Sequence, residues 1–347
     1  MRKQFGGKIT EDLKKQYARS KHWNGNKFVN LQSTGMSIGL KRVPKLLYKT
    51  FSGRRQRMPK QKIPIIPFDK EAFIEPSAKV KFIWYGHSVI LLMMGNKNIL
   101  IDPMLGPNAA PVAPFAIRRF SENTLEIIEQ LPPIDFILLT HDHYDHLDYE
   151  SIERLKTKVS KYCVALGCAR HLVSWGINPD DIFEFDWWER RTFEEFTFTF
   201  TPSRHFSGRG FSDRSKSLWG GWAIKTHTEN LYFSGDGGYG NHFKEIGDKL
   251  GPFDFAFMEC GQYNENWHQI HMYPEESVQA AMDVKAKYAM PVHWGGFSLS
   301  LHHWKEPVIR FAESAQKNNL SFITPELGAI INLDNSPNST AWYQAFE

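Results

Sequence analysis

The sequence predicts an α/β protein in which two mixed β-sheets are flanked by helices. From about residue 80 onward, short β-rich runs alternate with helical segments, which is typical of two sheets covered by helices. The chain has 347 residues, of which 41% are hydrophobic and 14% aromatic, so it can bury a sizeable core. A cluster of histidines and aspartates directly follows one apolar run, where a functional loop would leave a sheet edge.

Strands are expected where short runs of β-branched and aromatic residues end at turn residues. These runs lie at 81–85, 88–94, 98–101, 134–140, 162–166, 182–185, 196–201, 219–226, 231–234, 253–258, 288–291 and 329–333. Helices are expected where apolar residues recur at helical spacing. These segments lie at 122–130, 149–158, 171–175, 274–285 and 305–317.

Residues 1–75 are expected to form a basic, irregular arm, and residues 76–347 the main domain. Residues 1–60 hold sixteen Lys and Arg against only Glu11 and Asp12, a net charge of +14, which leaves −10 for the rest of the chain. This asymmetry indicates an anionic partner such as phospholipid head groups. Met36–Phe51 mixes apolar and basic residues, so it either lies on a membrane surface or packs on the domain. Pro44 interrupts any long helix there, which favours packing.

The remaining composition indicates a soluble protein of a reducing compartment. The first residues lack the apolar stretch of a secretory signal, and the most apolar run, Val89–Met94, is too short to span a bilayer. Three cysteines at unrelated spacings are typical of reduced thiols. We therefore expect a cytoplasmic protein, peripheral at the inner membrane surface if the arm binds lipid.

The strongest functional signal is the hexapeptide His141–His146, with the sequence HDHYDH, directly after the apolar run that ends at Thr140. Burying three imidazoles and two carboxylates without partners would cost several kcal/mol. A loop that leaves a strand can instead point them into one cavity. Imidazole and carboxylate groups are ligands that suit zinc, iron or manganese at a hydrolytic site.

Further candidate ligands follow later predicted strands. His205 stands in TPSRH, Asp236 in SGDGG and His293 in PVHWGG, each just after an apolar run. Because a sandwich brings strand ends together, we expect these three side chains to converge on the histidine-rich loop. Each residue alone could be an ordinary loop residue, and the set is what favours a shared site.

The order of these motifs resembles the metallo-β-lactamase superfamily, and within it the N-acyl-phosphatidylethanolamine-hydrolysing phospholipase D group and its bacterial relatives. The specific similarities are WYGHSVILL, LIDPML, APFAIRRF, HFSGRGFSDRSKSLWGGW and HMYPEESVQAAMDVKAKYAMPVHWGGFSL, which together span about residues 82 to 307. The resemblance implies an αββα sandwich. It also implies a homodimer as a possible assembly.

The resemblance implies two divalent metal ions, expected to be Zn²⁺, with iron or manganese as alternatives. His141, His143 and His205 would hold the first ion. The second would be held by Asp145, His146 and His293, with Asp236 bridging the two. Two such ions, about 3.5–4 Å apart, share a water and lower its pKa toward neutrality, and the resulting hydroxide would be the nucleophile.

Two residues are expected to assist the chemistry. Asp145 would aim the nucleophile by accepting a hydrogen bond, besides binding metal. His271 stands at a position where the family carries a functional histidine, and it would protonate or orient the leaving group. The alternative is that His271 only caps the helix that begins at Pro274.

Three residues are candidates for substrate contact. Arg209 and Arg214 follow His205 and would bind a phosphate, although a structural ion pair would explain them equally well. Trp294 would line an apolar pocket or belong to the core.

The sequence favours a phosphodiesterase of the phospholipase D type that acts on N-acyl-phosphatidylethanolamine or a similar phospholipid. A lactonase or small-ester hydrolase would use the same ligands. An RNA-processing nuclease is a third alternative, for which the basic arm is the argument; nucleic acid is the less expected partner because no dedicated RNA-binding module is present. A binding protein without turnover would not need the full ligand set.

Overall fold

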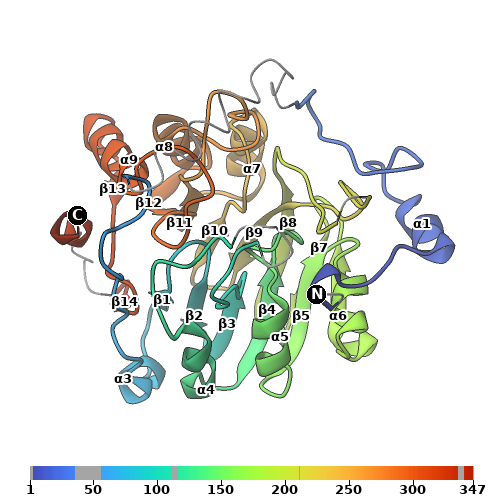
Figure 1. Cartoon of the computed structure of the whole chain (residues 1–347), viewed down its shortest axis with the longest axis horizontal. Coiled ribbons are helices and arrows are strands. Elements are labelled where there is room, and N and C mark those ends of the chain that lie inside the picture. The colour runs from blue at the N-terminus through green and yellow to red at the C-terminus, as the bar shows by residue number, and fades with distance from the viewer. Residues whose placement is uncertain (1–2, 36–55, 111–115, 211, 335–339, 347) are drawn as a thin grey trace.

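Two seven-stranded sheets lie face to face, with helices on both outer faces (Figure 1). The structure is a computed structural model and describes residues 3–35, 56–110, 116–210, 212–334 and 340–346. The two sheets and their outer helices confirm the predicted αββα sandwich. The segment Met36–Phe51 lies outside the described residues, so its two alternatives stay predictions.

The first sheet is antiparallel at one side and parallel at the other. Its strands, in spatial order, are β14 (Ile330–Asn332), β1 (Lys81–Trp84), β2 (Ile90–Met94), β3 (Lys97–Ile101), β4 (Ile134–Leu139), β5 (Val159–Ala165) and β6 (Ile182–Phe185). β1 to β3 form a meander, and β3 to β6 run parallel to one another. The parallel strands need crossover connections, which the helices supply.

The second sheet has the same mixed character. Its order is β13 (Ser321–Phe322), β12 (Ala286–Val292), β11 (Phe253–Glu259), β10 (Asn230–Phe233), β9 (Gly220–Lys225), β8 (Phe196–Pro202) and β7 (Arg190–Phe193). β7 to β10 are antiparallel, whereas β10 to β13 are parallel.

Helices cover the outer faces of both sheets (Figure 1). The first sheet is covered by η4 (Thr124–Glu126), α4 (Ile127–Gln130), α5 (Tyr149–Leu155) and α6 (Ala169–Ser174), with the turn η5 (Pro179–Asp181) before β6. The second sheet carries α7 (His242–Leu250), α8 (Pro274–Asp283) and α9 (Glu306–Lys317). α7, β7 and β13 were not expected from the sequence.

Aromatic side chains fill the space between the sheets. Phe82 of β1 packs against Phe257 of β11, with ring centroids 5.1 Å apart. Phe136 of β4 meets Phe198 of β8 at 5.0 Å, and Phe185 meets Trp222 at 5.0 Å. Edge-on aromatic pairs add about 0.5–1.5 kcal/mol beyond the area that they bury. This contact layer fixes one sheet relative to the other, and with it the strand ends that carry the candidate ligands.

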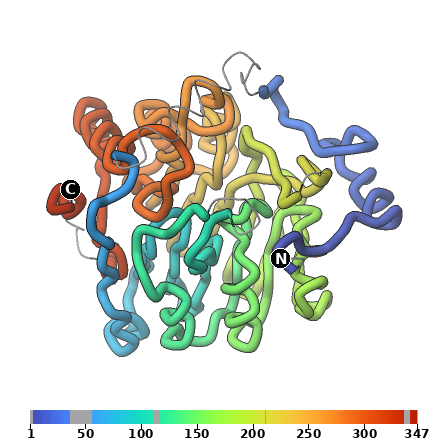
Figure 2. Tube along the Cα trace, viewed as in Figure 1, coloured from blue at the N-terminus to red at the C-terminus, as the bar shows by residue number. Residues whose placement is uncertain are grey.

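The described parts of the N-terminal segment pack on the domain. η1 (Lys3–Phe5), α1 (Glu11–Tyr17) and the chain to Gly35 run beside α6 and the 205–217 loop (Figure 2), and α3 (Lys70–Ile74) precedes β1. Tyr17, Trp23 and Phe28 are buried and form a small aromatic cluster of their own. The short helix η6 (Trp342–Ala345) stacks Trp342 on Trp294 near the other end of the sandwich.

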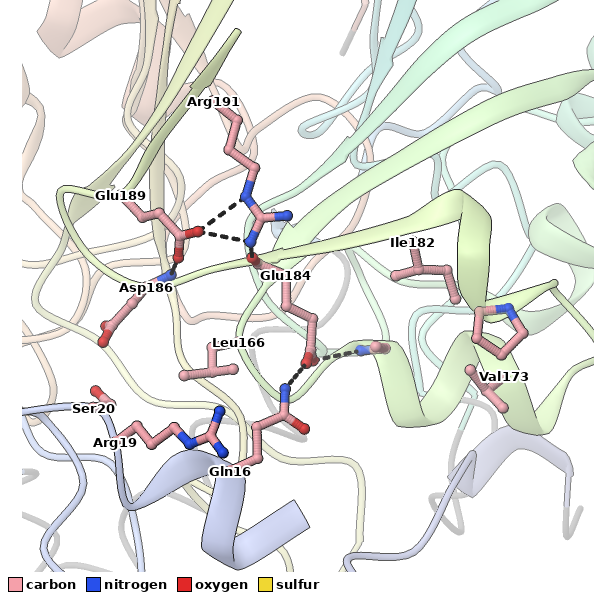
Figure 3. Close-up of a pocket in the computed structure, with 12 residues that line it drawn as sticks. Gln16, Arg19, Ser20, Leu166, Val173, Ile182, Glu184, Asp186, Glu189 and Arg191 are labelled. Carbon is pink, nitrogen blue, oxygen red and sulfur yellow. Dashed lines mark hydrogen bonds and ion pairs between the residues drawn. The ribbon is translucent and has the colours of Figure 1, made fainter. Parts of the chain in front are cut away.

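A polar cavity of about 500 Å³ lies where α1 meets the β6 edge (Figure 3). The Nε2 amide of Gln16 donates to Oε2 of Glu184 across it at 3.0 Å, and Arg191 pairs with Glu189 on its far wall. This cavity contains none of the candidate metal ligands. Within the described part of the chain, no helix is both long and apolar enough to cross a membrane.

Candidate metal centre

The histidine-rich loop leaves the end of β4 and turns back on itself. The backbone N–H groups of His146 and Leu147 both donate to the carbonyl of His143, which closes a tight turn. This turn sends His141 and His143 to one side and Asp145 and His146 toward the other.

His141, His143 and His205 form the first group of ligands. Nε2 of His141 lies 2.9 Å from Nδ1 of His143, and Nε2 of His205 lies 3.2 Å from the same atom. The three ligand atoms all lie within 4.8 Å of one another. His205 reaches this group from the loop after β8, as the sequence predicts.

Asp145, His146 and His293 form the second group. Oδ2 of Asp145 lies 3.3 Å from Nε2 of His293 and 3.6 Å from Nε2 of His146. His87, in the turn between β1 and β2, joins this group with its Nε2 atom 3.0 Å from Oδ2 of Asp145.

Asp236 lies between the two groups. Its Oδ2 atom is 3.1 Å from Nε2 of His146 and 3.0 Å from Nε2 of His293. The same oxygen is 4.0 Å from His141 Nε2 and 3.9 Å from His205 Nε2. One buried carboxylate oxygen therefore faces four imidazoles, two from each group, which is the place that a bridging ligand would take.

The second ring nitrogens of His141, His146 and His205 are held by partners outside the ligand groups, which tests whether the groups suit a metal. Nδ1 of His146 contacts Oδ2 of Asp102 at 2.8 Å, and Nδ1 of His205 contacts the carbonyl of Ile270 at 2.9 Å. Nδ1 of His141 lies 3.0 Å from Oγ1 of Thr140. A histidine that donates one ring N–H to such a partner presents the other nitrogen as a metal ligand. The donor set therefore fits divalent cations of the zinc type.

The charge state of the two groups differs. Burial lowers the pKa of His141, His143 and His205, so these imidazoles are neutral, as ligands must be. Burial also acts against a charge on His293, but the carboxylates of Asp236 and Asp145 raise its pKa to about 10. The carboxylates thus create a strongly negative point that a cation can neutralise.

Several residues at the site have unusual backbone conformations. His87, Asp102 and His293 all have positive φ angles, of 57°, 43° and 66°. Such angles are rare in residues other than glycine and cluster at functional sites. Gly235 next to Asp236 has φ 60°, and a Cβ atom there would lie 2.1 Å from the carbonyl oxygen of Gly220. Only glycine lets the Asp236 loop approach β9 this closely.

The ligands open into a cleft of about 290 Å³. His143, Asp145, Asp236 and His293 face it, and Phe206, Trp267, Ile270 and Leu299 supply its apolar walls. His271 also lines the cleft, with its ring stacked 5.3 Å from that of His293. The geometry therefore brings His271 to the site, as expected.

Glu259, at the end of β11, is the main residue that the sequence reasoning missed. Its Oε1 atom lies 2.7 Å from Nδ1 of His271, and its Oε2 atom accepts a hydrogen bond from the backbone N–H of Met272. Burial raises the pKa of Glu259 well above its usual range and lowers that of His271 to about 3. Both pKa shifts favour the neutral forms of the pair, a Glu259 carboxyl that donates to Nδ1 of His271 and an imidazole that presents Nε2–H to the cleft.

The sequence also provides no indication of the role of Asp142, which lies within the histidine-rich hexapeptide. Its carboxylate accepts bonds from Ser217 Oγ at 2.6 Å and Gly208 N at 2.6 Å, and it contacts His171 Nε2 at 3.1 Å. Arg170 completes this buried network at 3.3 Å. While its neighbours His141 and His143 face the ligand cluster, Asp142 ties the loop to α6 and to the 205–217 segment.

The structure places two of the three expected substrate contacts elsewhere. The Arg209 guanidinium is buried and donates to the carbonyls of Asp142, Leu147 and Gln4, so it braces the loop instead of reaching the cleft. Trp294 is buried between Trp84 and Trp342 and belongs to the core. Neither side chain reaches the cleft, so the expected phosphate contact of Arg209 is wrong, and for Trp294 the alternative of a core residue holds. Arg214 alone remains at the surface, beside Phe206.

Comparisons with known proteins agree with this geometry. The profile of the β-lactamase superfamily domain matches residues 97–294, which include all seven candidate ligands. The chain belongs to this superfamily, whose members include metal-dependent hydrolases. An uncharacterised protein of Mycobacterium tuberculosis is 31% identical over 94% of this chain and 88% of its own length.

One further relative and one solved structure are similar to this chain. The N-acyl-phosphatidylethanolamine-hydrolyzing phospholipase D 1 of Caenorhabditis elegans is 32% identical over 71% of this chain and 74% of its own. Among solved structures, the metallo hydrolase Igni18 of Ignicoccus hospitalis superposes with a TM-score of 0.57 at 18% identity, over 73% of this chain and 98% of its own. The second likeness concerns the fold alone.

The bracing role of Arg209 can be tested by its effect on stability. Arg209→Met leaves three carbonyls without their donor, at about 1–3 kcal/mol for each that stays buried and unsatisfied. We expect denaturant unfolding to show a loss of at least about 2 kcal/mol. The matched variant Arg214→Met removes only a ring contact and should cost less than about 1 kcal/mol. Equal losses in the two variants would contradict the assignment.

Proposed function

We propose that this protein is a phosphodiesterase of the N-acyl-phosphatidylethanolamine phospholipase D type that works with two zinc ions. The observation that supports this proposal most directly is the position of Asp236, one carboxylate oxygen between two histidine-rich ligand groups. A shared carboxylate is suited to a pair of divalent cations, which is the arrangement used for in-line displacement at phosphorus. The relatives from Caenorhabditis elegans and Saccharomyces cerevisiae, named for this hydrolysis, support the substrate class.

The chain's own residues would hold the ions in the two groups described above. His141, His143 and His205 would bind one ion, and Asp145, His146 and His293 the other, with Asp236 shared. When bound, the two ions supply a water activated near neutral pH and stabilise charge on the phosphoryl oxygens. Asp102 fixes the ring of His146 from behind, and His87 orients the carboxylate of Asp145.

The pair of Glu259 and His271 supplies a proton on the open side of the cleft. His271 would donate from Nε2 to the leaving oxygen, while the proton of Glu259 moves to Nδ1 across the 2.7 Å hydrogen bond. Positioned general acids of this kind contribute about 10²–10⁴-fold to rate.

The cleft walls fit an amphiphilic substrate. Phe206, Trp267, Ile270 and Leu299 stand around the polar ligand cluster, so an apolar portion of the substrate can lie beside a charged phosphodiester. Pockets of this type combine apolar walls with a few polar groups that fix orientation.

A substrate screen tests the proposed reaction. The full chain, loaded with zinc, should hydrolyse N-acyl-phosphatidylethanolamine in mixed micelles to phosphatidic acid and an N-acylethanolamine, and chelation should abolish this activity. Asp236→Asn should lower kcat by at least about 10³-fold because it removes the shared negative charge. The control His227→Ala, in the exposed turn after β9, should leave kcat unchanged. Faster turnover of a lactone or of RNA than of any phospholipid would overturn the proposal.

The role of His271 predicts a dependence on the leaving group. His271→Gln should lower kcat by about 10²–10⁴-fold for an alkyl phosphodiester, whose alkoxide needs a proton. For a p-nitrophenyl phosphodiester, whose phenolate leaves without one, we expect a loss of less than about tenfold. A loss of the same size for both substrates would show that His271 does not protonate the leaving group.

A further inference from the structure

A second cavity adjoins the cleft of the candidate metal centre. It measures about 240 Å³ and shares His205, Phe206 and Ile270 with the cleft. Its opposite wall is the N-terminal strap, by which we mean residues 27–35. The cleft and the cavity are therefore neighbours that meet at His205, Phe206 and Ile270.

The strap is fixed in place by bonds to the domain. The side chain of Asn30 donates to the carbonyl of His205 at 2.8 Å and accepts from the backbone N–H of His205 at 3.1 Å. The backbone N–H of Phe28 donates to the carbonyl of Ser215, and Arg204 donates to Ser33 and Thr34. The strap is thus hydrogen-bonded to the backbone of His205, a candidate metal ligand, and to the loop around Ser215.

The charges that line the cavity are all positive. Lys27 and Arg214 are its formally charged residues at neutral pH, and none of the described residues that line it is an aspartate or glutamate. The Arg214 guanidinium lies 3.7 Å from the ring centroid of Phe206. Within the described part of the chain, no carboxylate pairs with Arg214. A guanidinium that stacks on an aromatic ring and has no carboxylate partner is available to bind an anion.

Nearby groups add to the positive field. Lys216 bonds to the side-chain oxygen of Asn26 at 2.6 Å, one residue before the strap. Besides burial, the charges of Lys14 and Lys27 lower the pKa of Lys216. Positive charges are therefore close enough here to repel one another, and an anionic ligand would relieve that repulsion.

We propose that this cavity is an anion subsite in which Arg214 and Lys27 bind a phosphate group other than the one that reacts at the metal centre. Guanidinium and ammonium groups form strong charge-assisted hydrogen bonds with phosphate oxygens. N-acyl-phosphatidylethanolamine carries only the phosphodiester that reacts, so the second phosphate belongs either to the head group of a neighbouring lipid or to a soluble phosphate monoester. Its use during turnover rests on the proposed function, whereas binding to the cavity does not.

Site-resolved binding tests the proposal without turnover. sn-Glycerol 3-phosphate is titrated into the full chain with its metals, and the ¹⁵Nε–¹H signal of Arg214 is followed by NMR. That signal is identified by its loss in Arg214→Gln. We expect it to shift with saturation and the affinity to fall about tenfold in Lys27→Gln. The matched control Arg154→Gln, on α5 and paired with Glu129, should leave the titration unchanged.

Vesicles distinguish the two sources of phosphate. A response of the Arg214 signal to glycerol phosphate supports a soluble phosphate monoester as the occupant. If only vesicles of phosphatidylglycerol and phosphatidylcholine change the signal, the phosphate is that of a neighbouring lipid. A signal that neither probe changes would overturn the subsite. If the Arg214 signal responds as expected but the protein hydrolyses no phosphodiester, only the proposed function is overturned.

Discussion

The convergence of four imidazoles on the carboxylate of Asp236 is the constraint on which the rest of the site depends. A buried carboxylate is costly unless cations or strong donors surround it. Here the compensating groups come from the ends of β4, β8 and β12, which belong to two different sheets. The aromatic layer between the sheets therefore does more than stabilise the fold. It sets the distances between ligands that are far apart in the sequence.

The same convergence explains the supporting features around the site. Asp102 orients His146 and also accepts from the backbone and hydroxyl of Thr140, so the loop and its ligand are fixed together. Arg209 and Asp142 secure the loop from the outside through buried hydrogen bonds. The positive φ angles at His87 and His293 are tolerated because the surrounding bonds determine both conformations. The candidate ligand His293 and the neighbouring His87 thus lie at positions of local backbone strain.

Much of this arrangement could be predicted from the sequence because its signals are local. The hexapeptide His141–His146 is recognisable by residue type alone, and His205, Asp236 and His293 follow apolar runs that had to be strands. Glu259 obeys the same strand-end rule in FAFMEC, but a single glutamate gives no chemical signal until His271 is seen beside it. The predicted phosphate contact of Arg209 was wrong. The groups that accept its hydrogen bonds are backbone carbonyls, which no side-chain pattern reveals. Helix α7 was not predicted because Gly247 weakens its helical pattern. The structure explains this glycine, because a Cβ atom there would lie 2.1 Å from the carbonyl oxygen of Asp283.

The central claim is that the two ligand groups hold two ions with Asp236 between them. Anomalous diffraction at the zinc edge from crystals of the zinc-loaded protein tests it most directly. We expect two peaks, one about 2.0–2.2 Å from the ligand atoms of His141, His143 and His205, the other equally close to those of Asp145, His146 and His293. Both should lie next to the carboxylate of Asp236. A single peak, or a second peak away from Asp145 and His293, would contradict the account.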